Sequence, residues 1–323
     1  MKNSITKNLK EKTFADVCCG IGGFRLALEE AGARCVFASE TDKFACQVYK
    51  DNFGQTPMGD ITKIEVSEIP DIDILCAGFP CQPFSVAGKQ EGFKDAIRGT
   101  MYFYLLNIIE AKQPEIVFLE NVTNLEKHDN GNTFSIIKES LEQLGYTVHY
   151  KNLNASDYGV PQNRNRLYII AFHNDVNLKA FEFPTPIELT KCVSDILEPE
   201  ANIPDSLYKP AYDMVMKSDV KMRVNKPNQV AFVGKNRQGE RIYSIEGTAI
   251  TLTADGGGRF SKTGGYIIDG KPRKLSAREC ARLMGFPDDF VIDTSSNQAT
   301  KQFGNSVVVD VLQHIIANIE YED

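Results

Sequence analysis

Residues 13–172 alternate between short apolar segments and longer segments with helical periodicity, and this pattern constrains the fold more than any other feature. The short segments are typical of buried strands and occupy 13–19, 34–39, 71–78, 115–121, 146–155 and 166–172. Most of the longer segments between them place apolar residues three or four positions apart, as amphipathic helices do. Strands and helices in alternation predict an α/β fold, in which a mostly parallel sheet is covered by helices on both faces.

The alternation ends near Pro184, where the chain becomes rich in Pro, Gly and Lys. We expect residues 1–190 to form a first domain and residues 191–290 to form a smaller domain of loops and short strands. The apolar tail predicts one amphipathic helix within 303–323 that completes the first domain, with residues 291–302 as a hinge.

The formal net charge of −7 is unevenly distributed along the chain. Residues 209–282 contain fifteen Lys and Arg against seven Asp and Glu, whereas the rest of the chain is acidic. A basic domain beside an acidic one is expected where one domain contacts the phosphates of a nucleic acid. A solvated charged surface without a partner is the alternative interpretation.

No apolar run reaches the roughly 18 residues that span a bilayer, and no apolar stretch follows the lysines near the N-terminus. The eight cysteines are too few for a disulfide framework in 323 residues, and their spacing matches no zinc motif. We therefore expect a cytoplasmic protein with free thiols, no structural metal and no membrane contact.

Chemically distinctive residues follow four of the expected strands. In chain order they are Gly20 and Gly22 in a glycine-rich turn, Glu40, Cys81 and Glu120. Ligands of open parallel sheets bind at the carboxyl ends of the strands, so these residues are predicted to meet in one crevice. A carboxylate about 20 residues after a glycine-rich turn is typical of a contact with ribose hydroxyls. The turn is not GxGxxG, which favours a nucleoside without phosphates.

Cys81 lies between Pro80 and Pro83, directly after a strand-like segment. Most lone cysteines are buried and inert, but two prolines give this thiol a stiff backbone suited to attack from one direction. The polar segment that follows, 82–100, is long enough to form a functional lid. Protease or redox chemistry is disfavoured, because the thiol has no convincing histidine partner and no CxxC spacing.

Glu120 ends an apolar strand, where a carboxylate is costly unless it is paired or used. Arg164 and Arg166 open a later strand two positions apart, so their side chains face the same way. We expect one of them to hold Glu120 in the same crevice. The alternative is an ordinary surface ion pair.

Five motifs occur in order along nearly the whole chain: PCQPFS, ENV, QNRNR, RKLSARECARLMGFP and QFGNSVVVDVL. Together they resemble the motif set of DNA (cytosine-5)-methyltransferases, in particular the small enzymes of bacterial restriction–modification systems. The resemblance implies a Rossmann-like S-adenosylmethionine-dependent methyltransferase domain with a seven-stranded sheet. It also implies that residues 191–290 are a target-recognition domain, with double-stranded DNA bound between the domains.

The resemblance also implies roles for single residues. Cys81 adds to carbon 6 of a cytosine flipped out of the duplex, while Glu120 and Arg166 hold the base and Arg164 supports them. The implied S-adenosylmethionine site consists of Gly20, Gly22, Glu40, Asp60, Ile61, Pro80, Asn305 and Val307. The implied DNA contacts are Ser85, Ala87, Gln238, Arg241, Thr251 and Gly257. On sequence alone, Asp60 is equally well explained as a helix N-cap.

Four positions depart from the family pattern. Cys18 and Thr41 stand where aromatic residues usually occur, the second of which packs on adenine, so we expect a roomier pocket and weaker S-adenosylmethionine binding. Ala87 replaces a polar residue, and Asp255 replaces an aromatic one, among the implied DNA contacts. GCGC is the target that the resemblance suggests first, and these changes leave the exact sequence open.

Two alternative functions remain open. The PCQPF motif also occurs in a tRNA-modifying branch of the family, so an RNA cytosine-5 methyltransferase is one alternative. A catalytically inactive DNA-binding relative is the other, and the presence of Cys81, Glu120 and Arg166 argues against it. We expect a monomer that shares its site with a companion restriction endonuclease without forming a stable complex with it.

Overall fold

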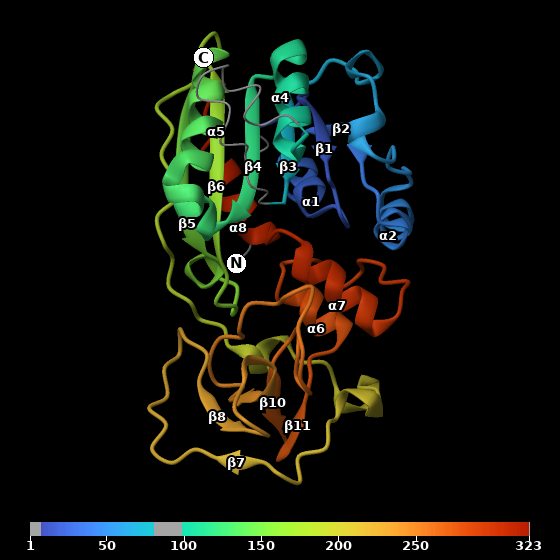
Figure 1. Ribbon diagram of the computed structural model, residues 1–323, viewed down its shortest axis with the longest axis vertical. Helices are drawn as coiled ribbons and strands as arrows, with labels where there is room; N and C mark the ends of the chain where they lie inside the picture. The colour runs from blue at the N-terminus through green and yellow to red at the C-terminus, as the bar shows by residue number, and fades with distance from the viewer. Residues whose placement is uncertain (1–7, 81–98, 323) are drawn as a thin grey trace.

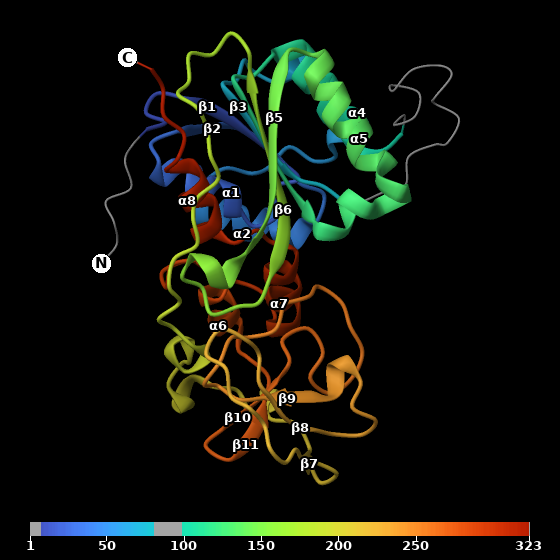
Figure 2. The same cartoon turned by 90° about the vertical axis from the view of Figure 1, so that its left-hand side faces the viewer.

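The computed structural model describes residues 8–80 and 99–322. These residues form two lobes, one built on a six-stranded sheet and the other on a five-stranded sheet (Figure 1). The helices α6 (Ala277–Arg282) and α7 (Ser296–Asn305) lie between the two sheets (Figures 1 and 2). Within the described residues, no helix has the length and apolar character needed to cross a membrane.

The large sheet has the strand order β2-β1-β3-β4-β6-β5. Its strands are β1 (Thr13–Val17), β2 (Arg34–Ser39), β3 (Ile74–Gly78), β4 (Ile116–Val122), β5 (Tyr146–Asn154) and β6 (Asn165–His173). Neighbours from β2 to β4 are parallel, whereas β6 runs antiparallel to β4 and to β5. This mostly parallel sheet confirms the α/β prediction.

The number of strands corrects one expectation. The family resemblance implied seven strands, but the apolar segments number six, and the described residues contain six strands in this sheet. In the described part of the chain after β6, residues 174–322, no further strand joins β5 or β2 at the sides of the sheet, and Leu178 pairs with Tyr321 only as an isolated bridge.

Alternation of side chains along the strands gives the large sheet two apolar faces. Phe14 and Phe118 pack in the core on one face, whereas Leu75 and Val117 pack in the core on the other. Figure 2 shows helices on both sides of the sheet. The first core includes residues of α1 (Gly23–Glu30), α2 (Lys43–Phe53) and α8 (Val309–Ile316), and the second includes residues of α4 (Met101–Lys112) and α5 (Asn132–Gln143).

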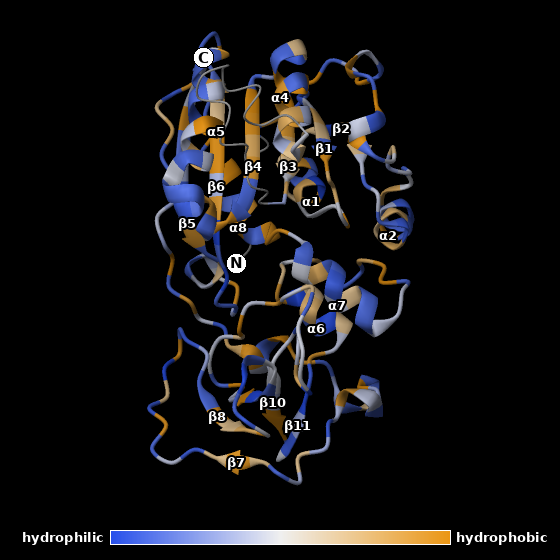
Figure 3. Ribbon diagram, viewed as in Figure 1, coloured by the Kyte–Doolittle hydropathy of each residue, from blue (hydrophilic) through white to orange (hydrophobic). Residues whose placement is uncertain are grey.

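Hydropathy changes where β4 ends. In Figure 3, β3 and most of β4 are hydrophobic, and β4 becomes hydrophilic at its carboxyl end. The change corresponds to Glu120 and Asn121, which follow four buried apolar residues. The strand thus carries its polar groups only at the edge of the sheet.

The small lobe has strands of two to four residues in the order β11-β10-β9-β8-β7. They are β7 (Val215–Met216), β8 (Gln229–Phe232), β9 (Arg241–Tyr243), β10 (Gly265–Ile268) and β11 (Lys271–Arg273). This matches the expected loops and short strands. The exact limits of the two domains and the hinge at 291–302 stay predictions.

The helix of the tail, α8, is shorter than the range 303–323 that we expected for it. Helix α7 ends at Asn305, α8 begins at Val309, and the backbone of Ser306 and Val308 is extended between them. Three consecutive β-branched valines follow Ser306, and such residues lose side-chain freedom in a helix. The chain therefore breaks at this point and enters the large lobe as a separate short helix.

A buried ion pair joins α6 to β11. Arg273 donates two hydrogen bonds to the carboxylate of Glu279, at 2.7 and 2.6 Å, and both side chains are almost inaccessible. The same carboxylate accepts hydrogen bonds from the backbone N–H groups of Ser276 (2.8 Å) and Glu198 (3.0 Å). One acidic side chain thus connects β11, α6 and the segment before the small lobe.

Replacing Glu279 with Ala should lower the free energy of unfolding by about 3–5 kcal/mol, because the buried guanidinium of Arg273 loses its partner. Urea denaturation followed by circular dichroism measures the change. The control is Glu142→Ala, which removes an exposed ion pair to Lys138 on α5 and should change stability little. Equal losses in the two variants would contradict the prediction.

Candidate active site

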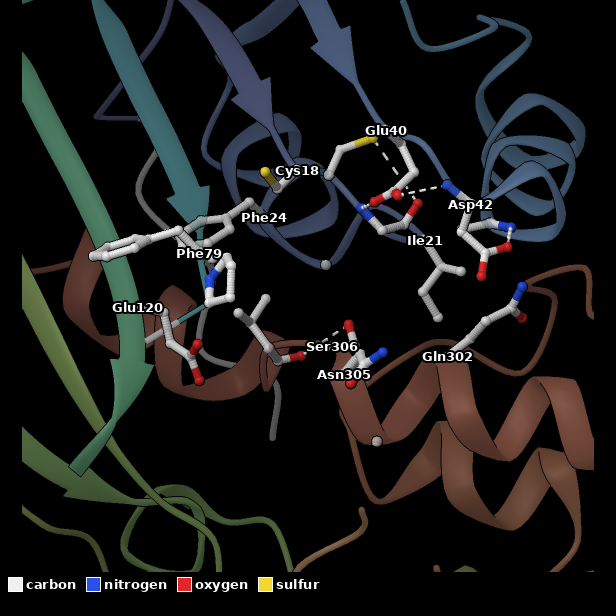
Figure 4. Close-up of a pocket in the computed structure, with 18 of the residues that line it drawn as sticks. Cys18, Ile21, Phe24, Glu40, Asp42, Phe79, Glu120, Gln302, Asn305 and Ser306 are labelled. Carbon is white, nitrogen blue, oxygen red and sulfur yellow. Dashed lines mark hydrogen bonds between the residues drawn. The ribbon is translucent and has the colours of Figure 1, made fainter. Parts of the chain in front are cut away.

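A cavity of about 460 Å³ lies at the edge of the large sheet where β1 to β4 end and β6 begins. Figure 4 shows side chains from these strand ends and from the α7–α8 segment directed toward one space. The predicted site residues that line it are Gly20, Glu40, Pro80, Glu120, Arg164, Arg166, Asn305 and Val307. The cavity thus brings together residues of the first and last parts of the chain.

Glu40 is fixed against the glycine-rich turn after β1. Its Oε2 accepts a hydrogen bond from the Gly20 N–H at 2.9 Å, and its Oε1 accepts from the N–H groups of Thr41 and Asp42. Gly20 has a left-handed backbone (φ 54°), and a Cβ added to it would meet no atom within 4 Å. The turn therefore leaves open space beside an anchored carboxylate.

Cys18 lies in the same wall but is a poor nucleophile. Burial raises the pKa of its thiol to about 12, and the nearby carboxylates of Glu40 and Asp16 add to the shift. A thiol with this pKa stays protonated at neutral pH, whereas thiol chemistry needs the thiolate. Cys18 therefore acts as a small, neutral part of the wall.

Glu120 and Arg166 form an ion pair inside the cavity. Arg166 Nε lies 3.1 Å from Glu120 Oε1, and both side chains are largely buried. Burial raises the pKa of Glu120, and the positive charges of Arg166 and Arg164 partly oppose that shift. The contact with Arg166 is an ion pair by distance only, and Glu120 Oε1 accepts no hydrogen bond of good geometry among the described residues. This carboxyl can therefore take up a proton more readily than an exposed one and donate it to a group in the cavity.

Asn121 connects the ends of β3 and β4. Its Nδ2 donates a 2.9 Å hydrogen bond to the carbonyl of Phe79, the residue before Pro80. This bond holds the chain at the cavity wall where the predicted nucleophile follows. Cys81 itself lies outside the described residues, as do Ser85 and Ala87.

Arg164 lines the cavity, but its guanidinium donates no hydrogen bond to Glu120. Its guanidinium donates to the main-chain carbonyls of Leu252, Gly304 and Ser306. Burial lowers the pKa of Arg164 to about 10, so the group remains charged at neutral pH. Of the two arginines, Arg166 is the one that pairs with Glu120.

Gly22 is a predicted cofactor residue that does not line this cavity. A Cβ at Gly22 would lie 2.3 Å from the ring of Phe53, and its backbone is left-handed (φ 87°). Close packing between the glycine-rich turn and α2 therefore requires glycine at this position.

Asp60 and Ile61 lie beyond the main cavity. Asp60 caps a short 3₁₀ helix, Ile61–Lys63, by accepting a hydrogen bond from the Thr62 N–H at 3.0 Å, which agrees with the alternative interpretation as a cap. Ile61 is buried beneath that turn. Asp60 also lines an outer hollow of about 600 Å³ together with Thr41 and Glu40. Because Glu40 lines both spaces, the cavity and the outer hollow meet at this side chain.

The small lobe has a separate cavity of about 180 Å³. It gathers Gln238, Thr251 and Gly257 from the predicted DNA contacts, together with Asp255. Arg241 does not line it and lies at the start of β9, where Nε donates to the carbonyl of Asn236 at 3.4 Å.

Some lining residues were not identified from the sequence. Phe24 and Phe79 contribute aromatic rings to the main cavity, and Gln302 and Ser306 contribute polar groups from the tail (Figure 4). Phe79 follows β3 directly, and Gln302 and Ser306 lie within the QFGNSVVVDVL motif. Their positions in the sequence could therefore have indicated that they lie near the site. The packing of α7 against this edge of the sheet could not be derived from that signal.

Comparison with known proteins gives consistent results. Type II methyltransferase M.HhaI of Haemophilus parahaemolyticus is 52% identical, over 97% of this chain and 95% of its own. Type II methyltransferase M.MspI of a Moraxella species is 42% identical, over 98% of this chain and 77% of its own. Among solved structures, the Dnmt2 methyltransferase of S. pombe shares the fold, with a TM-score of 0.73 and 21% identity, over 95% of this chain and 98% of that chain.

The family model described as C-5 cytosine-specific DNA methylase matches residues 12–321. The match covers both lobes, the cavity at the edge of the large sheet and the returning tail. The chain belongs to the C-5 cytosine-specific DNA methylase family.

Proposed function

We propose that this protein methylates carbon 5 of a cytosine in double-stranded DNA, with S-adenosylmethionine as the methyl donor. One observation carries the proposal: the buried pair of Glu120 and Arg166 shares a cavity with the anchored carboxylate of Glu40, and Pro80 in its wall directly precedes Cys81. The relatives named Type II methyltransferases support the modification half of a restriction–modification system.

The reaction assigns a separate task to each residue. The thiolate of Cys81 adds to carbon 6 of the cytosine, and this addition makes carbon 5 nucleophilic. Glu120 donates a hydrogen bond or a proton to N3 as negative charge develops on the base, and Arg166 orients Glu120. S-adenosylmethionine would supply an electrophilic methyl group: carbon 5 would bond to that methyl group as its bond to sulfur breaks, and S-adenosylhomocysteine would leave. Loss of the carbon-5 proton and elimination of the thiol then release the methylated base and regenerate the enzyme.

The cavity suits a nucleoside with a charged amino-acid tail. Glu40 presents a carboxylate suited to ribose hydroxyls, and the open space beside Gly20 allows close approach of a ligand to the backbone. Pro80, Asn305 and Val307 line the rest of the proposed cofactor site. Asp60 would face the adenine from the outer hollow, with Thr41 in place of an aromatic ring, whereas Ile61 lines neither space and would act only through the turn that it anchors.

The small lobe would read the DNA. Its predicted contacts around Gln238 and Thr251 surround one cavity, within the basic stretch 209–282. A cytosine inside a duplex cannot reach a cavity at the edge of the large sheet, so the base must flip out. We propose GCGC as the target, a monomeric enzyme in the cytoplasm, and a companion endonuclease that acts on the same site.

Replacing Cys81 with Ser should abolish methyl transfer to DNA, because serine does not form a comparable nucleophile at neutral pH. The wild-type protein should methylate cytosine at one short motif of a plasmid, as read by bisulfite sequencing and by transfer from labelled S-adenosylmethionine. Cys192→Ser, far from the cavity in sequence, is the matched control and should retain activity. Transfer to tRNA but not to DNA would instead support the RNA alternative.

Replacing Glu120 with Gln should reduce methyl transfer by about 10²- to 10⁴-fold, since the proposed proton donor is lost. It should also change how stability depends on pH. The raised pKa of Glu120 means that its contribution to stability is present below its unfolded pKa and is lost as pH rises through its folded pKa. The variant stays neutral at this position, so it should gain stability relative to wild type as the pH is raised from about 4 to about 8.

Urea denaturation at several pH values measures this difference without substrate or cofactor. Glu142→Gln, at an exposed position on α5, serves as the control. A stability difference between wild type and Glu120→Gln that does not vary with pH would contradict a raised pKa.

Replacing Thr41 with Trp should tighten S-adenosylmethionine binding. An aromatic ring beside Glu40 would close the opening between the cavity and the outer hollow and pack on adenine. Such contacts contribute about 0.5–1.5 kcal/mol, which corresponds to about a 2- to 12-fold lower dissociation constant in calorimetry. Gln47→Trp, which lines only the outer hollow, is the control, and equal affinity of wild type and Thr41→Trp would refute the roomier pocket.

A further inference from the structure

Arg164 is buried, yet its guanidinium pairs with no carboxylate among the described residues. Only 2% of the residue is exposed. Nη1 donates to the carbonyl of Leu252 at 2.9 Å, and Nη2 donates to the carbonyls of Gly304 (3.1 Å) and Ser306 (2.6 Å). All three partners are main-chain groups, so what Arg164 fixes is the course of the backbone.

The three carbonyls belong to two segments with different tasks in the proposed function. Gly304 and Ser306 flank Asn305, which lines the main cavity. Leu252 follows Thr251, the first residue of the stretch 251–257 that lines the small-lobe cavity. One guanidinium therefore joins the wall of the proposed methyl-donor site to the base of a proposed DNA-reading loop.

The two segments are also in direct contact. A Cβ added to Gly304 would lie 2.4 Å from the carbonyl carbon of Thr253, so the backbones leave no space between them. The residues before Arg164 hold the same stretch: the Asn163 N–H donates to the Ala249 carbonyl at 2.8 Å, and the Gln162 side chain accepts from the Leu252 N–H at 3.0 Å. A displacement of either segment must therefore move the other or break these bonds.

The three hydrogen bonds of Arg164 require a guanidinium, which a lysine side chain does not have. A planar guanidinium can donate to several carbonyls at fixed angles, whereas an ammonium on a flexible stem cannot reproduce this arrangement. Arg166, two residues along the same strand face, has the different partner Glu120. Arg166 in β6 thus serves the proposed chemistry, and Arg164, directly before the strand, fixes the backbone around it.

We propose that Arg164 is a positioning residue that couples occupation of the methyl-donor cavity to DNA binding by the small lobe. The inference rests on the proposed function. A ligand that orders Asn305 and its neighbours would also favour one position of the 251–257 stretch through Arg164. By thermodynamic linkage, DNA bound at that stretch would then raise cofactor affinity by the same factor.

The test measures coupling rather than activity. The dissociation constant of a DNA duplex carrying the mapped methylation site is measured by fluorescence anisotropy, with and without S-adenosylhomocysteine, which cannot donate a methyl group. In wild type we expect S-adenosylhomocysteine to tighten DNA binding by about 5- to 150-fold. In Arg164→Met the ratio should fall to about twofold or less, and Arg164→Lys should not restore it.

Two matched variants separate coupling from catalysis and from general destabilisation. Arg166→Met should lose methyl transfer but keep the coupling ratio. Arg25→Met removes another buried guanidinium, bonded to Glu29 and Gln55 away from the cavity, and should also keep the ratio. If Arg164→Met does not fold, Gly304→Ala tests the same contact, because its Cβ must push the 253–254 backbone away and lower the ratio.

A folded Arg164→Met variant that keeps the wild-type ratio would overturn the inference and leave the proposed function intact. The same holds for a wild-type protein that methylates DNA but shows no coupling. A wild-type protein that transfers no methyl group to DNA would overturn the proposed function, and the inference with it.

Discussion

The site depends on one constraint: the carboxylate of Glu120 lies near the end of β4, a strand that is buried on both faces. β4 lies between β3 and β6, and burying a charge there costs free energy unless an opposite charge lies close by. The reversed direction of β6 supplies that charge. Because β6 is antiparallel to β4, it begins where β4 ends, and Arg166 lies opposite Val122, two residues after Glu120. A parallel β6 would have placed both arginines at the opposite edge of the sheet.

The other residues that line the cavity lie at this same edge of the sheet, because the carboxyl ends of parallel strands meet there. β1 and β2 bring Gly20 and Glu40, whose hydrogen bond holds the two strand ends in one geometry. The tail closes the space from the other side because the chain breaks after α7, and α8 packs against α1. Without that break, Asn305 would lie in the middle of a helix, whereas in the structure it lines the cavity as the last residue of α7.

Much of this was predictable from local pattern. The six strands, the convergence of Glu40 and Glu120, and an arginine partner for Glu120 all follow from apolar periodicity and from the alternation of strand side chains. The strand pattern did not decide which arginine pairs with Glu120, since the carbonyl partners of Arg164 lie 88 to 142 residues away in sequence, and only the family resemblance pointed to Arg166. The close packing of Gly22 on Phe53 and the two-helix tail likewise depend on contacts between distant segments.

The unequal pairing of the two arginines has an electrostatic consequence. Arg166 faces a carboxylate, whereas Arg164 is bonded only to carbonyls, so Glu120, Arg164 and Arg166 together carry a net positive charge when Glu120 is ionised. Carbonyl dipoles accept hydrogen bonds from Nη1 and Nη2 of Arg164 without cancelling its charge, and its buried Nε has no hydrogen-bond partner among the described residues. This surplus is one positive charge while Glu120 is ionised and two when Glu120 is protonated. In a cavity of low dielectric it would stabilise the negative charge that the proposed reaction develops on a bound base, and most strongly while Glu120 holds a proton. In the proposed reaction, the proton on Glu120 and the charge on Arg164 would therefore act together on the same developing charge.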